Sequence, residues 1–254
     1  MTIFLIAEVT AVSLLVKYIS GTNLWITAGI VIITSLIYTL YGGLRASLFT
    51  DNIQFVIFGL LLLIVFTNIF SLNLGNFNFD YITENKPYLL SSKYLPNFTA
   101  GLTFFIAVAA TNLFHQGNWQ RVYAANNNKV LKKSLFFSFL IILPIVFLMG
   151  FSGLIAVSQN ETVIPDLAFF SLILKENGIQ LSIIIIILAI SLTISSIDTL
   201  INAISSLIIV DGIKVFKGKK DYFKLSNQIV ILLSIIAFLV ASKGLSILYL
   251  FLLA

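Results

Sequence analysis

The 254-residue sequence contains no cysteine, one histidine and few charged residues, which make up 10% of the chain. Without cysteine the chain forms no disulfide, zinc–thiolate site or iron–sulfur cluster, and it has no catalytic thiol. A single histidine excludes a metal site built from several imidazoles. Hydrophobic residues make up 59% of the chain, against about 45–50% apolar residues in a soluble domain. These proportions exclude an ordinary soluble protein, a disordered chain and, despite a net charge of +5, a basic nucleic-acid binder.

Long uninterrupted apolar runs predict an all-α, polytopic membrane protein. A helix needs about 20 apolar residues to cross a bilayer, and several runs approach or exceed that length. We expect one transmembrane domain over residues 1–254, in which the last predicted span is truncated after about two turns. The predicted spans lie near residues 3–19, 24–40, 53–70, 98–114, 134–157, 179–210, 229–240 and 247–254.

The distribution of basic residues predicts the orientation of these spans. Lys and Arg favour the cytoplasmic side of a membrane, and most of them lie in three alternate loops. We therefore expect an integral protein of the plasma (inner) membrane with these loops in the cytoplasm: Arg45, Arg121–Lys133 and Lys214–Lys224. The loops at 71–97 and 158–178 then face outward. Either can hold a short surface helix, and residues 166–174 are the better candidate.

The predicted span at 179–210 carries a polar stripe. Small hydroxyl residues also promote packing between membrane helices, but a mid-membrane carboxylate such as Asp198 marks a cation or proton site by default. Adjacent hydroxyls near a carbonyl suit a hard cation, which takes oxygen ligands. Steps of four and three residues place five polar side chains on one helical face: Ser191, Ser195, Asp198, Asn202 and Ser205.

A polar segment follows the predicted span at 98–114. Hydrogen-bonding side chains crowd around Gly117 between Thr111 and Arg121. This pattern favours a helix that unwinds beside a cavity, where freed backbone groups face water or solute. The alternative is a plain cytoplasmic helix end with Trp119 as its interface anchor. His115 by itself indicates little, because a lone histidine is more often a packing residue.

Paired glycines and two carboxylates stand near the ends of the other spans. Gly42 and Gly43 allow a sharp turn. We interpret Asp51 as a hinge or as an N-terminal cap of the span that follows, where its charge meets the positive end of the helix dipole. Glu8 lies about one turn inside the first span, and we interpret it as a side chain that reaches the membrane interface.

No enzyme motif accompanies these polar groups. The sequence contains no His-Glu-x-x-His, no G-x-S-x-G and no phosphate-binding loop. A membrane enzyme would rest on His115 and the scattered carboxylates alone. We therefore expect that the protein is not an enzyme and that it uses no cofactor.

Three of these segments resemble motifs of the sodium:solute symporter family. Residues 41–54, with Tyr-Gly-Gly-Leu-Arg-Ala, Phe-Thr-Asp and Gln54, are similar to its Y-G-G-L-x-A…W-T-D…Q signature, with Phe49 in place of the usual tryptophan. Residues 120–125 resemble its Q-R-x-x-A-A element. Residues 195–211 are similar to its S-S-x-D-S-x-L-N-S-x-S-T-L…D signature, the most specific of the three. The likeness runs through nearly the whole chain.

The resemblance implies a leucine-transporter-like core of two inverted five-helix repeats, with solute and ion bound near the midplane at broken helices. It implies a sodium site at Ser195 and Ser196, with the Leu192 carbonyl and Asp198 beside them. Asp198 can instead orient the serines or carry a proton. Asn112, His115 and Gln116 are the implied solute-binding residues. Six further residues have an implied gating or structural role: Gly42, Gly43, Asp51, Gly117, Trp119 and Asn202.

The implied function is sodium-coupled symport of a small polar organic solute by alternating access. Its partners are the solute, sodium and membrane lipid, with no nucleic acid. Counted against the ten-helix core, the chain begins at core helix three, so we expect a fragment, a split gene product or a degraded relative, for which a partner chain can supply the missing helices. The alternative is a non-transporting membrane scaffold or accessory subunit. The family carries proline, urea, organic acids, vitamins and sugars, so the sequence names no solute.

Overall fold

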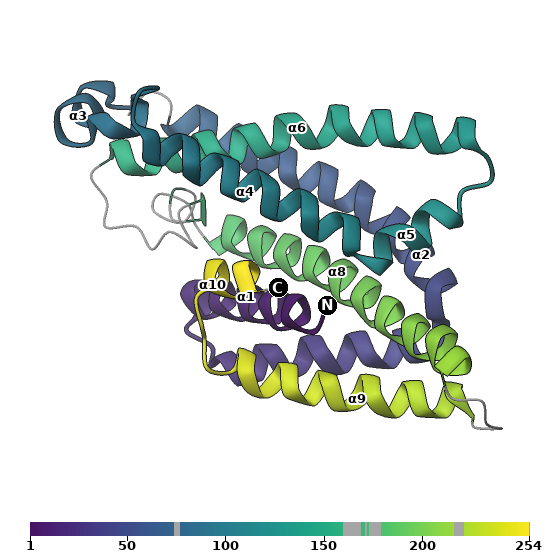
Figure 1. Ribbon diagram of the computed structural model, residues 1–254. Helices are drawn as coiled ribbons and strands as arrows, with labels where there is room; N and C mark the ends of the chain where they lie inside the picture. The colour runs from purple at the N-terminus through teal and green to yellow at the C-terminus, as the bar shows by residue number, and fades with distance from the viewer. Residues whose placement is uncertain (74–76, 160–168, 171, 173–178, 216–220, 254) are drawn as a thin grey trace. The chain divides into compact units, whose positions relative to one another are not determined.

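The computed structural model describes residues 1–73, 77–159, 169–170, 172, 179–215 and 221–253 (Figure 1). Within these residues every regular element is a helix, which confirms the predicted all-α class. The elements are α1 (Thr2–Ser20), α2 (Leu24–Asn73), α3 (Phe79–Asn85), η1 (Pro87–Leu90), α4 (Leu95–Phe114), α5 (Gln116–Tyr123), α6 (Asn128–Ser158), α8 (Ile179–Val215), α9 (Tyr222–Ala241) and α10 (Ile247–Leu253).

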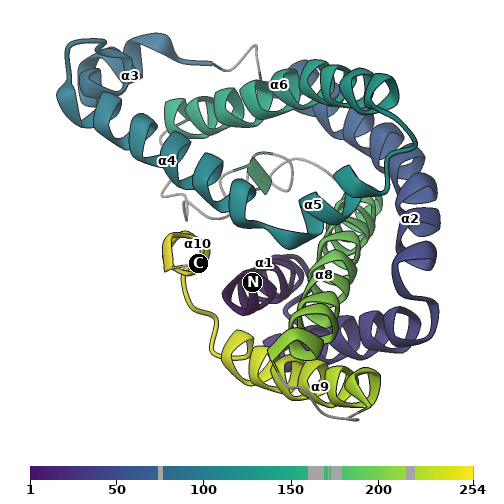
Figure 2. The same cartoon turned by 45° about the vertical axis from the view of Figure 1, so that its right-hand side comes forward.

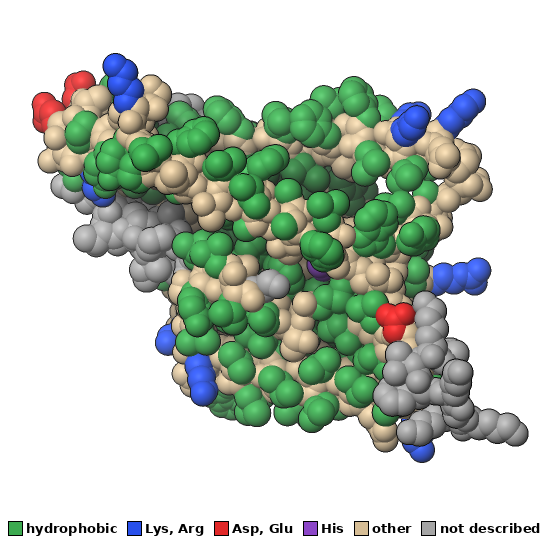
Figure 3. Space-filling view, in the orientation of Figure 1, with side chains coloured by type: hydrophobic (Ala, Val, Ile, Leu, Met, Phe, Trp, Pro, Cys, Tyr) green, Lys and Arg blue, Asp and Glu red, His purple; other side chains and the backbone are tan. Residues whose placement is uncertain are grey.

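Six helical segments in the described part of the chain are long and apolar enough to cross a membrane, and each overlaps one of the predicted spans. One of them, Thr39–Asn68, also includes the predicted loop that precedes the span at 53–70. The predicted span at 24–40 corresponds to the shorter apolar segment Leu24–Ile37 at the start of α2, and the truncated last span corresponds to α10. Hydrophobic side chains cover much of the face drawn in Figure 3, whereas its charged side chains lie near helix ends. The polytopic membrane architecture is thereby confirmed.

The two predicted outer loops differ in what the structure describes. The first contains α3 and η1, so the prediction of a short helix there is confirmed. The Asn78 side chain caps α3 by accepting a hydrogen bond from the Tyr81 N–H at 2.9 Å. The helix predicted over 166–174 lies largely outside the described residues.

Contacts divide the chain into two compact units. The first contains Met1–Leu61, His115–Gln120 and Ile183–Ala254; the second contains Leu62–Phe114 and Arg121–Ser182. In the second unit, α3 packs against η1 and α6, and the Phe77 and Phe151 rings lie 5.9 Å apart. The single transmembrane domain that the sequence suggests stays a prediction.

The core of the first unit surrounds α1, which packs against α9 and α10 (Figure 2). Because lipid is as apolar as aliphatic side chains, burial of these side chains between membrane helices stabilises the core through van der Waals packing. The hydroxyls of Thr10 and Ser13 are also buried, and each donates to a carbonyl one turn earlier in α1. The core brings together apolar side chains from α1, α2, α8, α9 and α10: Leu5, Val9, Val12, Ala28, Val31, Ile197, Ile201, Val230, Ala237 and Leu250.

Two interruptions of helical geometry confirm the expected turn and break. Gly43 lies inside α2 with φ 55° and ψ −154°, a conformation that side chains with a Cβ rarely adopt. His115 separates α4 from α5, next to the predicted unwinding at Gly117. Whether this second break borders a cavity stays a prediction.

Candidate functional site

The polar stripe of α8 makes hydrogen bonds to three other helices of the first unit. The Ser195 hydroxyl reaches α2, the hydroxyls of Ser205 and Ser226 lie 2.8 Å apart between α8 and α9, and the Ser206 hydroxyl accepts from the Gln120 amide in α5. The same amide approaches the Asn202 carbonyl oxygen at 3.4 Å. Residues of the stripe therefore take part in contacts between helices, whereas the predicted cation or proton site on this face stays a prediction.

Ser195 pairs with a carboxylate from α2. Its hydroxyl donates to Asp51 Oδ1 at 2.6 Å, and both side chains are partly buried. The sequence interpretation of Asp51 as an N-terminal cap is wrong, because the helix continues without interruption from Leu44 past Asp51. The hydroxyl of the preceding residue, Thr50, donates to the carbonyls of Ala46 and Ser47 in the same helix.

Ser196 pairs with a carboxyl group from α1. Its side chain forms a hydrogen bond with Glu8, which is partly buried where α1 packs in the core of the first unit. The interpretation of Glu8 as a side chain that reaches the membrane interface is therefore wrong. Sequence reasoning missed this contact, because nothing in the local sequence indicates which helix faces Glu8.

The two serines consequently lie between acidic side chains of two different helices. Consecutive residues of a helix point about 100° apart, so neighbouring hydroxyls on α8 reach different partners. Ser195 faces Asp51 and Ser196 faces Glu8. Each hydroxyl donates one hydrogen bond and keeps oxygen lone pairs for another ligand.

The α2 face that carries Asp51 also presents two buried oxygens for which the described part of the chain supplies no hydrogen-bond partner. Ser47 and Gln54 lie four residues before and three residues after Asp51, on the same side of the helix. Ser47 Oγ and Gln54 Oε1 have no hydrogen-bond partner among the described residues. Buried oxygens normally have partners, and a set of hydroxyl, amide and carboxylate oxygens fits a hard cation. The donor atoms therefore fit the sodium that the resemblance implies, and Ser47 is a residue the sequence analysis missed.

Asp198 and Leu192 occupy different positions along the same helix. Asp198 is fully buried, and its Oδ1 lies 3.3 Å from the Thr199 hydroxyl. Leu192 stands in an unbroken part of α8, so its carbonyl takes part in the hydrogen bonding of the helix and keeps one lone pair. Their predicted roles at the ion stay predictions.

Gly117 brings α5 close to α8. A Cβ placed at Gly117 would lie 2.6 Å from Thr199 Cγ2 and 2.9 Å from His115 Cε1, so the buried glycine permits this approach. The His115 ring lies 6.1 Å from the Phe4 ring of α1 in an edge-on arrangement. Gln116 is partly buried, and Trp119 is among the exposed aromatics.

Asn112 belongs to the second unit. It lies in the last turn of α4, and its Nδ2 donates to the Val108 carbonyl at 2.8 Å. Its predicted contact with the solute stays a prediction.

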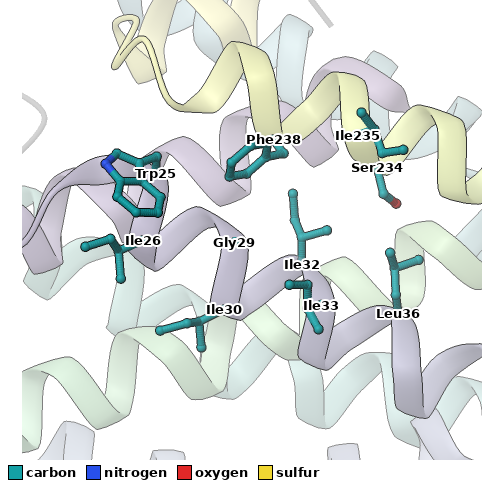
Figure 4. Close-up of a pocket in the computed structure, with 10 residues that line it drawn as sticks. All are labelled: Trp25, Ile26, Gly29, Ile30, Ile32, Ile33, Leu36, Ser234, Ile235 and Phe238. Atoms are coloured by element: carbon teal, nitrogen blue, oxygen red, sulfur yellow. The ribbon is translucent and has the colours of Figure 1, made fainter.

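An apolar groove between α2 and α9 is a separate feature of the first unit (Figure 4). The volume of the groove is about 480 Å³. It is lined by Trp25, Gly29, Ile235, Phe238 and five further Ile and Leu side chains. The Oγ of Ser234, also in the lining, is buried without a partner among the described residues. This groove offers a polar solute almost nothing to bind, so the site is better sought along α8.

Comparison with known proteins gives two matches. The family model described as sodium:solute symporter family matches residues 1–253. The spermidine transporter DUR31 of Candida albicans (strain SC5314 / ATCC MYA-2876) is 27% identical over an alignment of 224 residues, and the match covers 86% of this chain. The match covers 41% of DUR31, so the chain spans less than half the length of that relative. No solved structure gives a significant match.

Proposed function

Because the chain belongs to the sodium:solute symporter family, we propose that it acts in sodium-coupled symport of a small polar organic solute by alternating access. The activity is proposed for the assembly that the chain forms in the plasma membrane, with or without a partner chain. Spermidine is the first solute to test, because the relative DUR31 is a spermidine transporter. The observation that carries the proposal is the pair of hydroxyls on α8, each hydrogen bonded to an acidic side chain of another helix.

The proposed sodium site contains the hydroxyls of Ser195 and Ser196 and the carboxylate of Asp51. Asp198 and the Leu192 carbonyl are further proposed ligands. The unpartnered oxygens of Ser47 and Gln54 support this choice, because they complete an oxygen-rich surface on α2. One sodium ion that crosses about 100 mV releases about 2.3 kcal/mol. That energy supports roughly 50-fold accumulation of solute, since each factor of ten costs about 1.4 kcal/mol.

The two helix breaks are the proposed hinges of the transport cycle. Gly43 divides α2 just before the segment that carries Asp51, and His115 separates α5 from α4. Solute is proposed to bind beside Asn112, His115 and Gln116. Sodium binding would favour an outward-open state, solute binding would close the outer gate, and a change at these breaks would open the inner side. A leucine-transporter-like inverted repeat is the proposed framework.

The charge distribution supports an orientation for this cycle. The loops at Arg45, Arg121–Lys133 and Lys214–Lys224 are proposed to face the cytoplasm. Cysteine substitutions tested with a membrane-impermeant thiol reagent would check this. The natural chain has no cysteine, so a single Lys132→Cys or Lys86→Cys variant reports one loop at a time. Labelling from outside is expected at position 86 and not at position 132.

Replacement of both serines tests the ion site. In vesicles with an imposed sodium gradient, Ser195→Ala/Ser196→Ala is expected to raise the sodium concentration for half-maximal spermidine uptake by more than about tenfold, since hydrogen-bonding groups that meet a charge contribute about 1.5–3 kcal/mol. Ser152→Ala is the matched control, because the Ser152 hydroxyl donates to the Met149 carbonyl of its own helix α6. Unchanged sodium dependence in the double variant would refute the assignment.

A non-transporting membrane scaffold or accessory subunit is the second candidate function. Purified chain in liposomes, with and without a candidate partner chain, separates the two. Sodium-driven uptake by the chain alone would exclude a purely accessory role.

A further inference from the structure

Glu8 is a carboxyl group inside the predicted span at 3–19. Among the described residues, the Glu8 side chain forms a hydrogen bond with Ser196, and no Lys, Arg or His forms an ion pair with it. An ionised carboxylate accepts about four hydrogen bonds. A carboxylate at the centre of a span costs about 2.5–3.5 kcal/mol on insertion scales, and such residues normally mark an ion or substrate pathway. Glu8 therefore has both unused acceptor capacity and a charge that a cation would balance.

Aromatic rings gather on the same side of α1. Phe4 lies four residues before Glu8, which places both side chains on one face of the helix. The Phe4 ring lies 5.2 Å from the Phe251 ring of α10 and 6.1 Å from the His115 ring, edge-on in both cases. Helices α1 and α10 are in contact, as Figure 2 shows. Aromatic faces attract ammonium groups within about 6 Å of the ring centroid.

We propose that Glu8, Ser196, Phe4 and Phe251 recognise a protonated amino group of the solute, so that the transported class is alkylammonium compounds, polyamines included. Three N–H donors of an ammonium group match the free lone pairs of the Glu8 carboxylate and the Ser196 oxygen. The apolar part of the solute lies against the rings. This inference rests on the proposed function, and it gives that function a substrate class.

Ser196 links this site to the proposed ion site. Its hydroxyl contacts Glu8, while the adjacent Ser195 contacts Asp51. An ammonium group at Glu8 would therefore contact Ser196, and a sodium ion would contact Ser195 together with Ser196, so both cations would meet consecutive residues of α8. Binding of one cation fixes the rotation of α8 that the other requires, which is a direct physical route for coupling.

Two ligands of equal length test the substrate class without transport. Putrescine (1,4-diaminobutane) and 1,4-butanediol share the four-carbon chain and differ in their charged ends. In detergent at constant sodium, putrescine and spermidine are expected to raise the unfolding temperature of the purified protein, and butanediol is not. Equal effects of putrescine and butanediol, or no effect of either amine, would overturn the inference.

The Glu8→Gln variant tests the role of Glu8 in binding the amine. The change keeps the size of the side chain and removes its charge, so we expect the concentration of spermidine for half-maximal stabilisation to rise about 10- to 100-fold, the loss of one charge-assisted hydrogen bond. Glu84→Gln is the matched control, because Glu84 is exposed in α3. Phe4→Leu is expected to raise the same concentration about 2- to 30-fold. Wild-type spermidine affinity in Glu8→Gln would refute the assignment.

The outcomes separate this inference from the proposed function. Sodium-dependent spermidine uptake that is unchanged in Glu8→Gln would refute the amine site and leave symport standing. Spermidine binding that depends on Glu8, together with uptake that does not depend on sodium, would support the amine site and refute the coupling of uptake to sodium. A folding defect in Glu8→Gln is recognised by Glu8→Asp, which keeps the charge and is expected to restore most of the amine binding.

Discussion

Helices α8 and α6 are both long and apolar, yet their hydroxyl groups differ in their hydrogen-bond partners. The α8 hydroxyls of Ser195, Ser205 and Ser206 take part in hydrogen bonds with α2, α9 and α5. The α6 hydroxyls of Ser134, Ser152 and Ser158 donate to carbonyls three or four residues earlier in their own helix. A hydroxyl that donates to a carbonyl of its own helix needs no hydrogen-bond partner on a neighbouring helix. A hydroxyl that bonds another helix specifies which helix lies there and how it is rotated.

The largest expected difference concerns two glycines, Gly117, which faces α8, and Gly150, which lies within α6. Gly117→Ala would place a Cβ 2.6 Å from the Thr199 side chain of α8, and overpacking of this kind lowers the free energy of unfolding by about 1–3 kcal/mol. Gly150→Ala in α6 meets no atom within 4 Å and is expected to raise stability by up to about 1 kcal/mol through helix propensity. Thermal unfolding in detergent measures both, and equal stabilities would show that α5 does not press against α8.

The next prediction concerns the bend that precedes Asp51. Gly43 has a positive φ, so Gly43→Ala is expected to cost about 1–3 kcal/mol of stability. It should also raise the half-saturating sodium concentration, because the direction of the following part of α2 changes. Gly59→Ala is the control within the same helix, since its Cβ would meet open space. Equal sodium dependence in the two variants would argue against Gly43 as a hinge.

A smaller effect is expected for the contact between α5 and α8. A double-mutant cycle with Gln120→Leu and Ser206→Ala should give a coupling energy of about 0.6–1.7 kcal/mol, the range for hydrogen bonds between membrane helices. Chemical unfolding in mixed micelles supplies the four stabilities. Ser134→Ala in α6 should change stability by less than about 0.5 kcal/mol. A coupling energy near zero would remove the distinction between the two helices.

The smallest effect is expected where α8 meets α9. The Ser205 and Ser226 hydroxyls lie 2.8 Å apart, and a cycle of the two alanine variants should give a coupling energy of about 0.6 kcal/mol. Uptake should change little, because neither residue belongs to the proposed ion or solute site. A large loss of sodium-dependent uptake in Ser205→Ala would extend the functional part of the stripe toward the end of α8.

Most of the fold followed from local features of the sequence. Apolar runs of sufficient length predicted the six candidate spans, since a bilayer accepts little else. Gly43 marked a break because glycine tolerates its backbone conformation. The polar face of α8 followed from helical periodicity alone, and its hydrogen bonds to other helices agree with that prediction.

The assignments that failed were those that depended on a distant partner. The place of Asp51 in the sequence suggests a cap, but the helix begins before it, at Leu44, and the Asp51 side chain meets Ser195. The distance of Glu8 along the chain suggests the membrane interface, but the Glu8 side chain meets Ser196. Neither position carries a local signal for a contact with a residue more than 140 positions away.

The sequence alone therefore determined that this is a polytopic helical membrane protein with a polar face on one span, because length and periodicity depend only on neighbouring residues. Only the tertiary structure decided which acidic side chain each α8 serine meets. That choice depends on how α1 and α2 are rotated about their axes as they pack against α8, which is set by the fit of many apolar side chains at once.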